Sequence, residues 1–198
     1  MVERASFRTE VRQLFRDRTL DAARELTCAA GWDHVTMSAI AERVGVSRQA
    51  LHKEMGAKQA VGEALVSRET DHFLSGISQQ LRRHPTDPVA GMVAAVELSL
   101  HEGADNTLLK AIVAGAHGPD PGLLPLLSLQ SGPVLSRAVA AITDEARRLY
   151  TPDTDGELLG TTVEVVVRLT LSHLLQPTGT IDAAVEQIHR ALVGLLGS

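Results

Sequence analysis

The stretch GVSRQALHKE, residues 45–54, decides how this chain folds. It follows a run beginning at Thr36 in which apolar residues recur at helical spacing. Glycine commonly ends a helix and serine commonly begins one, so Gly45 to Ser47 predicts a tight turn between two short helices. We expect Thr36 to cap the first helix and Ser47 to cap the second. Two helices joined by such a turn form the helix-turn-helix arrangement.

The second short helix is expected to bury one side and to expose a polar face. Ala50, Leu51 and Met55 are predicted to point inward, and the outward residues are Arg48, Gln49, His52 and Lys53. In a helix-turn-helix the second helix enters the major groove of DNA, where its first turn faces base edges. The alternative is an ordinary surface helix with a solvated polar face, and this stretch alone leaves both interpretations open.

The composition indicates a folded, helical protein. Apolar residues make up 44% of the 198 residues and charged residues 22%, which is ordinary for a folded soluble chain. Aromatic residues are only 3%, so the core must be built from Leu, Val, Ile and Ala. No separate run alternates as a strand does, and we predict an all-α fold of about nine helices. Residues 1–58 would form a three-helix domain containing the helix-turn-helix, and residues 59–198 a second helical domain.

Charge is distributed unevenly along the chain. The net charge of −5 by itself argues against a nucleic-acid partner. Residues 1–60 nevertheless hold 10 Lys and Arg against 8 Asp and Glu, whereas residues 61–198 hold 9 against 16. A modestly basic front end therefore precedes an acidic body, which is a weak indication that the front end binds DNA.

Other classes of protein are disfavoured by the sequence. The single cysteine, Cys28, excludes a disulfide framework and a cysteine-based zinc site, and no metal ion or cofactor is expected. The charged N-terminus is unlike an export signal, so we expect a cytoplasmic protein. The most apolar run, 158–175, contains Glu164, Arg168 and His173, which favours a buried helix over a membrane span.

Patterns typical of enzymes are also missing. The sequence contains no G-x-S-x-G nucleophile motif, no H-E-x-x-H metal motif, no P-loop and no dinucleotide-binding glycine motif. The stretch DTDGE, residues 153–157, lacks the spacing of a calcium loop and is better explained as a helix start. We therefore do not expect an enzyme.

Residues 19–61, TLDAARELTCAAGWDHVTMSAIAERVGVSRQALHKEMGAKQAV, resemble the N-terminal region of tetracycline-repressor (TetR) family regulators almost position by position. The resemblance implies that residues 1–58 bind a double-stranded DNA operator. It also implies that residues 59–198 bind a small-molecule effector and form a homodimer. The rest of the chain agrees with the family in size and helical character.

The same resemblance assigns a DNA-binding role to individual residues: Thr36, Ser47, Arg48, Gln49, His52, Lys53 and Lys58. Gln49 occupies a base-reading position, where its amide can pair with adenine N6 and N7. The other residues would contact phosphates or flank the base contacts. His52 stands where the family usually has tyrosine, and Met55 where it has phenylalanine, which leaves the contact geometry at His52 open.

A basic pattern precedes the region of resemblance. Arg4, Arg8, Arg12 and Arg16 recur every four residues, which on a helix gives a slowly drifting basic stripe. One interpretation is an N-terminal arm that follows the DNA backbone. The other is a solvated tail.

The C-terminal region suggests a ligand cavity and a dimer interface. Only Phe73 and Tyr150 are aromatic after residue 60, so a cavity there would be aliphatic and would favour an apolar ligand. Arg68 and His72 fall on one stripe of a helix and are candidate polar anchors, unless they lie at its edge and reach solvent. Two apolar helices, 157–175 and 180–196, would form the homodimer, with Val166 in the seam and Glu164 paired with Arg168.

Together these observations predict a TetR-like repressor that a small apolar ligand releases from a near-palindromic operator. The same fold acting as an activator or as a ligand-independent regulator remains an alternative. A helical protein–protein interaction module is a further one.

Overall fold

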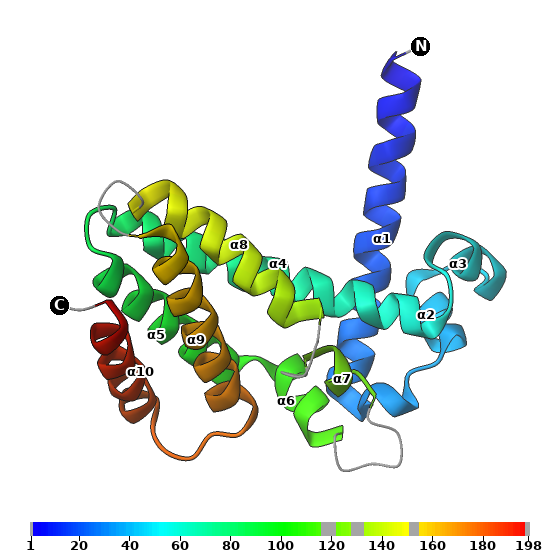
Figure 1. Ribbon diagram of the computed structural model, residues 1–198. Helices are drawn as coiled ribbons and strands as arrows, with labels where there is room; N and C mark the ends of the chain where they lie inside the picture. Colours follow the sequence, from blue (N-terminus) through cyan, green and yellow to red (C-terminus); the bar gives the residue numbers. More distant parts are fainter. Residues whose placement is uncertain (1, 116–121, 128–132, 151–154, 197–198) are drawn as a thin grey trace. The chain divides into compact units, whose positions relative to one another are not determined.

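The computed structural model describes residues 2–115, 122–127, 133–150 and 155–196, with the backbone alone for residues 2–8, 115, 127 and 133. These residues form ten α-helices and one short 3-10 helix, and no strand occurs among them (Figure 1). The all-α prediction is confirmed. The described residues form one α-helix more than the nine or so predicted. The shortest of them, α7, is a single turn of four residues.

The helices follow one another as α1 (Val2–Ala30), η1 (Trp32–His34), α2 (Met37–Val44), α3 (Arg48–Met55), α4 (Lys58–Arg83), α5 (Pro88–Asp105), α6 (Thr107–Gly115), α7 (Leu124–Leu127), α8 (Pro133–Tyr150), α9 (Gly156–Leu175) and α10 (Ile181–Leu196). The chain divides into two compact units. Unit 1 comprises Met1–Arg68 and Thr107–Pro125, and unit 2 comprises Glu69–Asn106 and Leu126–Ser198. The units are defined by packing alone, so the functional boundary predicted between residues 58 and 59 stays a prediction.

Unit 1 builds its core around the second half of α1, which packs against α2, η1 and α6. The buried apolar side chains include Leu20, Ala23, Trp32, Ile40, Leu51, Val61, Leu65, Leu108 and Ile112. Gly62 permits this packing, because a Cβ at that position would lie 2.6 Å from Leu123 Cδ2 and 2.7 Å from Trp32 Cζ2. The core therefore joins the helix-turn-helix to a segment more than 40 residues further along the chain.

Unit 2 is held together by aliphatic side chains, as the low aromatic content predicted. Helices α5, α8, α9 and α10 pack on one another and bury Leu81, Met92, Val96, Leu100, Leu135, Ile142, Leu159, Val163, Ile188 and Leu192. Asp87, Asp155 and Thr180 accept hydrogen bonds from the first turns of α5, α9 and α10. Aspartate and threonine are typical residues at a helix start, so the sequence predicts the caps at Asp87 and Thr180; these caps and the helix start within DTDGE are confirmed.

Helix α9 is the helix of the described residues that is long and apolar enough to span a membrane by length and composition. It packs against α5, α8 and α10, as a core helix does. Its predicted ion pair is present, with 2.7 Å between Arg168 Nη2 and Glu164 Oε1. The placement of Val166 in a dimer seam is wrong. Val166 is 7% exposed and lies inside the core of unit 2, because its position on α9 faces the neighbouring helices.

Candidate nucleic-acid interface

The turn between α2 and α3 is closed by backbone hydrogen bonds. Gly45 adopts a left-handed conformation, with φ 80° and ψ 34°. Its amide donates to the carbonyls of Ala41 at 2.9 Å and Glu42 at 3.1 Å, and the amide of Val46 donates to Ala41 at 2.9 Å. Side chains with a Cβ rarely adopt this conformation, so Gly45 ends α2 and directs the chain into α3.

Both predicted caps of the helix-turn-helix are confirmed. Thr36 Oγ1 accepts a hydrogen bond from the amide of Ala39, and Ser47 Oγ accepts one from the amide of Ala50, each at 3.1 Å. Each hydroxyl satisfies an amide that the first turn of its helix would otherwise leave unpaired. Thr36 and Ser47 are exposed, so both helix starts lie at the surface of unit 1.

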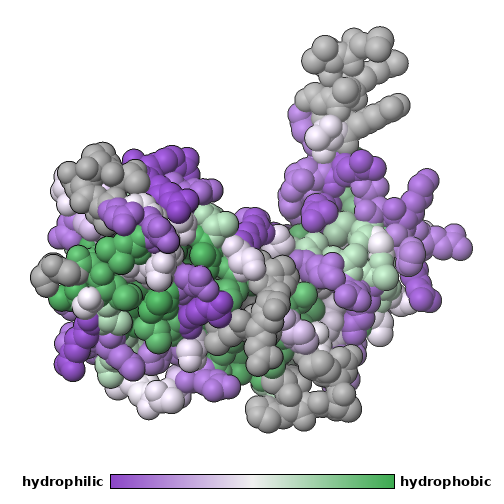
Figure 2. All heavy atoms as spheres, in the orientation of Figure 1, coloured by the Kyte–Doolittle hydropathy of each residue, from purple (hydrophilic) through white to green (hydrophobic). Residues whose placement is uncertain are grey.

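Helix α3 presents a polar face. Its buried side chains are Leu51, which is 0% exposed, and Met55, which is 8% exposed. Its exposed polar side chains are Arg48, Gln49, His52 and Lys53, and Figure 2 shows the hydrophilic surface over this helix. Ala50 was expected to point inward and is exposed, because α3 buries only the narrow stripe of positions 51 and 55. The four outward residues are therefore brought together as predicted, whereas their roles toward DNA stay predictions.

Lys58 is the first residue of α4 and is half-buried. Its Nζ donates to the carbonyl oxygen of Asp33 at 3.3 Å and lies 5.1 Å from the centre of the Trp32 ring. An ammonium group has three N–H donors, so this hydrogen bond leaves others for a phosphate. The phosphate contact predicted for Lys58 is compatible with this position and stays a prediction.

The predicted basic arm begins α1, which is 29 residues long. Arg12 forms an ion pair with Glu54, near the end of α3. No sequence pattern predicts this pair, because 42 positions separate its members. The side chains of Arg4 and Arg8 lie outside the described residues, and Arg16 is exposed.

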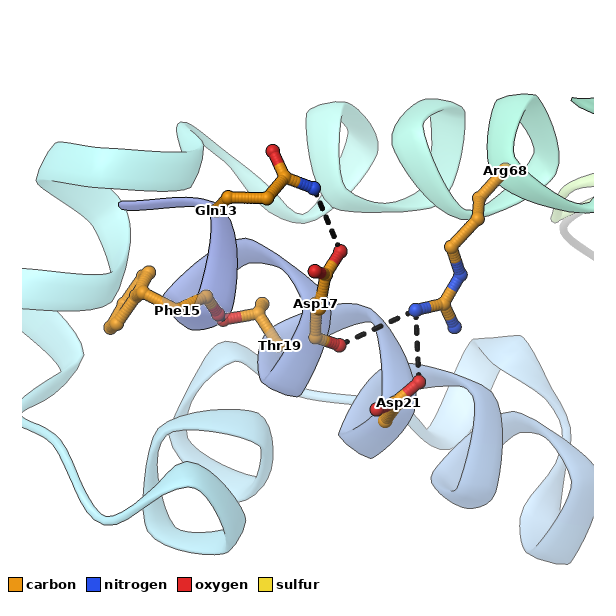
Figure 3. A network of polar contacts seen from close by, with 6 residues as sticks. All are labelled: Gln13, Phe15, Asp17, Thr19, Asp21 and Arg68. Atoms are coloured by element: carbon orange, nitrogen blue, oxygen red, sulfur yellow. Dashed lines mark hydrogen bonds and ion pairs between the residues drawn. The ribbon is translucent and has the colours of Figure 1, made fainter. Parts of the chain in front are cut away.

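Arg68 and His72, the two candidate polar anchors of a ligand cavity, both lie on α4. Arg68 donates to Asp21 Oδ1 at 2.9 Å and to the carbonyl oxygen of Asp17 at 3.4 Å, so its guanidinium points toward α1 (Figure 3). His72 is exposed, and its ring meets that of Phe73 edge-on with 6.3 Å between centroids. This agrees with the alternative that the two residues lie at the edge of the stripe, which is half-buried at residue 68 and reaches solvent at residue 72. These contacts lend the ligand assignment no support, and it stays a prediction.

Three buried polar atoms of unit 2 lack a hydrogen-bond partner among the described residues: Glu102 Oε2, Thr143 Oγ1 and Thr162 Oγ1. Thr162 is 0% exposed and Thr143 is 8% exposed. An unpaired buried polar atom costs free energy, so each one calls for a partner such as a water or a ligand. These residues could not be identified from the sequence, because nothing in a helical pattern distinguishes a buried threonine from an exposed one.

Two family models match this chain. Residues 20–65 match the bacterial regulatory proteins of the tetR family. Residues 87–193 match the C-terminal domain of the bacterial tetracyclin repressor. The second match begins at residue 87, just before α5 of unit 2. It also includes α6, which belongs to unit 1.

Curated relatives agree with these matches. The HTH-type transcriptional regulator AlkX of Mycobacterium tuberculosis is 28% identical over 178 residues, which cover 89% of this chain and 82% of AlkX. The HTH-type transcriptional activator FasR of Mycolicibacterium smegmatis is 35% identical over 82 residues, which cover 41% of this chain and 37% of FasR.

Solved structures share the fold. The TetR family repressor AlkX from Dietzia sp. superimposes with a TM-score of 0.74 at 22% identity, covering 92% of this chain and 95% of that one. The fatty acid degradation regulator FadR from Bacillus halodurans superimposes with a TM-score of 0.55 at 18% identity, covering 90% and 97%. This chain therefore belongs to the TetR family of DNA-binding transcriptional regulators, whose members dimerise and bind small-molecule effectors.

Proposed function

We propose that this protein is a homodimeric repressor that binds a near-palindromic operator and is released from it by a small, largely apolar effector. The observation that carries the proposal is the outer face of α3, where four exposed polar side chains stand on a helix anchored by Leu51 and Met55. A helix fixed on one side and polar on the other suits insertion into a major groove.

The contacts to DNA are proposed residue by residue. Gln49 lies in the first turn of α3 and reads a base edge. Arg48, His52 and Lys53 lie beside it and contact phosphates or neighbouring bases. Thr36, Ser47 and Lys58 begin α2, α3 and α4, and their hydroxyls, amides or ammonium group contact phosphates.

The dimer interface is proposed on α9 and α10, the helices predicted from residues 157–175 and 180–196. The outer side of α9 carries Leu158, which is 37% exposed, and the half-buried Val165. On α10, Ala183 and Gly194 are exposed and small enough for a second helix to approach closely. Two copies of this helix pair would form a four-helix interface about a twofold axis. The two copies of α3 would then lie about 34–36 Å apart, which is one turn of DNA, or a multiple of that distance.

The interface is tested by placing a charge on it. Val165→Glu should convert the dimer to a monomer at micromolar concentration in sedimentation, because the charge would be buried between copies. Ser136→Glu is the matched control, since Ser136 is exposed and belongs to α8, which is not one of the two helices of the proposed interface. Val166→Glu is unsuitable because Val166 is buried within one copy. A Val165→Glu protein that stays dimeric refutes this interface.

The effector is proposed to be an aliphatic molecule with one polar end. The core of unit 2 is aliphatic, and Glu102, Thr143 and Thr162 carry its buried unpaired polar atoms. The similar Dietzia AlkX is implicated in n-alkane biodegradation, and FadR is a fatty acid degradation regulator, which supports an aliphatic effector here. A terminal hydroxyl could donate to the Glu102 carboxylate and accept from a threonine.

DNA binding and release are tested together by fluorescence anisotropy, with labelled DNA from the region upstream of the protein's own coding sequence. We expect tight, salt-dependent binding at a near-palindrome and weak binding to random DNA. 1-Octanol should release the protein at lower concentration than octane. Absence of any preferred site contradicts the proposed function, and binding that neither compound weakens contradicts the proposed effector.

An activator is the second candidate, because the activator FasR is similar to this chain over 41% of its length. Transcription in vitro from a promoter that contains the bound site separates the two. A repressor lowers the amount of transcript when it is added, and an activator raises it.

A further inference from the structure

Unit 1 contains a cavity of about 330 Å³ that lies apart from the face of α3. The end of α1, η1 and α6 form its wall, together with Gly122 and Leu123. All of the lining residues belong to unit 1, and they include none of Arg48, Gln49, His52 or Lys53. The volume falls at the lower end of the roughly 300–1,000 Å³ typical of small-molecule pockets. A cavity of this size suits a ligand with a small body.

The lining is mostly apolar, with an acidic group at one side. Ala30, Trp32, Ala111, Ile112 and Leu123 supply apolar surface. Asp33 supplies a carboxylate, and among the described residues no cationic side chain forms an ion pair with it. An apolar wall with a single unpaired carboxylate suits a molecule with an apolar body and a positively charged end.

The end of α1 adds to this preference for a cation. The last carbonyls of a helix have no partner within the helix and carry partial negative charge. Helix α1 has no basic residue in its last turn to offset that charge, and Cys28 and Ala30 in this turn line the cavity. Lys58, which does not line the cavity, donates to the Asp33 carbonyl of η1 and lies against Trp32.

We infer that this cavity binds a small primary amine with an apolar body, and that an occupied cavity weakens DNA binding. Trp32 and Asp33 line the cavity and also hold Lys58, a proposed phosphate contact. His34, another lining residue, precedes the cap Thr36 by two positions. A molecule that displaces η1 would therefore shift two groups proposed to contact DNA. The effect on DNA rests on the proposed function, whereas binding of the amine does not.

The chain provides its own reporter for the test. Trp32 is the only tryptophan, so tryptophan emission reports on the cavity wall directly. We would titrate the full-length protein with cyclohexylmethylamine, cyclohexylmethanol and cyclohexanecarboxylate, which share one apolar body and differ in charge. The amine should give a saturable change at millimolar concentration. The alcohol should bind roughly threefold to fivefold more weakly, as expected for the loss of a partly exposed ion pair, and the carboxylate should not bind.

Variants separate the cavity from the rest of unit 1. Asp33→Asn should bring the affinity for the amine closer to that for the alcohol, because it removes the carboxylate and leaves the carbonyls at the end of α1 in place. Ala111→Leu should abolish binding of both compounds by filling the cavity. Ala114→Leu, at an exposed lining position, replaces it if circular dichroism shows that Ala111→Leu is misfolded. Ala29→Leu is the matched control, because Ala29 is exposed on α1 and does not line the cavity.

The outcomes distinguish this inference from the proposed function. The amine should lower the affinity of the unmodified and Ala29→Leu proteins for the operator, and leave that of the cavity-filled variant unchanged. The inference is overturned if Trp32 shows no saturable response to the amine. It is also overturned if both cavity-filled variants respond to the amine as strongly as the unmodified protein does. A protein that binds the amine but no DNA retains the cavity site and loses the proposed function.

Discussion

The helix-turn-helix of unit 1 and the long helices of unit 2 are stabilised by different means. Helices α2 and α3 have eight residues each, well below the length at which an isolated helix is even marginally stable in water. They depend on the hydroxyl caps of Thr36 and Ser47, on Gly45, and on a few buried side chains. Helices α9 and α10 have 20 and 16 residues and bury continuous aliphatic stripes against their neighbours.

The difference bears on where each unit can carry function. In unit 1 the residues that fix the fold are few, which leaves most of α3 free to face a partner. In unit 2 the inner sides of the long helices form one shared core, so the effector proposed above would be recognised by the few polar atoms inside it. The following predictions test this contrast.

The largest effects should come from emptying either core. Leu51→Ala and Leu159→Ala each remove a side chain that is 0% exposed and should each lower the free energy of unfolding by about 2–5 kcal/mol. Leu51→Ala should also weaken DNA binding, because Leu51 anchors α3. Urea unfolding followed by Trp32 emission reports on unit 1, and circular dichroism reports on both units. Equal shifts of the Trp32 transition in both variants would mean that the two units unfold as one.

A second test uses Tyr150, the only tyrosine, which lies in unit 2. Burial, and then the carboxylates of Asp87 and Glu145, raise its pKa to about 12. The folded state holds the phenol proton more tightly than the unfolded state, whose tyrosine pKa is about 10. This stabilisation is complete below pH 10 and is lost as the pH rises toward 12. Phenolate absorbance should have its midpoint near pH 12, and a midpoint near pH 10 in the folded protein would contradict the burial of Tyr150.

A third test compares exposed amides on the two units. Gln49→Ala should cost about 1–3 kcal/mol on the preferred site and little on random DNA. Lys53→Ala should weaken binding to all sequences and reduce the salt slope by about one. Gln187→Ala on α10, also at an exposed position, should change neither quantity. Equal losses on specific and random DNA would remove Gln49 from base reading.

Smaller effects are expected at the helix caps. Ser47→Ala and Thr180→Ala each remove a hydroxyl that accepts from the first turn of a helix, and each should lower stability by about 1 kcal/mol. Only Ser47→Ala should weaken DNA binding as well. Melting temperatures and operator affinities are measured for both variants. An equal loss of operator affinity in Thr180→Ala would contradict a local role for Ser47 in DNA binding.

The smallest change in stability is expected at Arg12, which is exposed and paired with Glu54. Arg12→Ala should alter stability by less than about 1 kcal/mol. If Arg12 follows the DNA backbone, the salt slope should fall by about one as well. Glu54→Gln is the control, because it breaks the ion pair and keeps the arginine. An unchanged slope in Arg12→Ala identifies Arg12 as a partner of α3 alone.

The parts of the structure that sequence predicted are those set by local hydrogen bonds. Thr36, Ser47, Asp87 and Thr180 cap helices because a short polar side chain can reach the amides of the next turn whatever the rest of the chain does. The aliphatic core of unit 2 followed from composition. The outward direction of Arg48, Gln49, His52 and Lys53 followed from helical periodicity.

The parts that sequence did not predict depend on contacts between distant residues. Periodicity identified the apolar sides of α9 but not which neighbouring element each side contacts, and Val166 lies in the core of unit 2. Arg68 was assigned by its stripe on α4, but its long side chain reaches a carboxylate on α1. The cavity in unit 1 forms because α6 packs beside the end of α1. Nothing in the sequence of residues 107–115 predicts that α6 would contact α1.

The narrow buried stripe of α3 has a consequence for engineering and for evolution. Since Leu51 and Met55 hold the helix, substitutions at the four outward positions should change which promoters are recognised at little cost in folding. Duplicated copies of the gene could therefore acquire separate regulons through a handful of codon changes while unit 2 stays the same. The same property makes α3 a suitable place to transplant the specificity of another regulator.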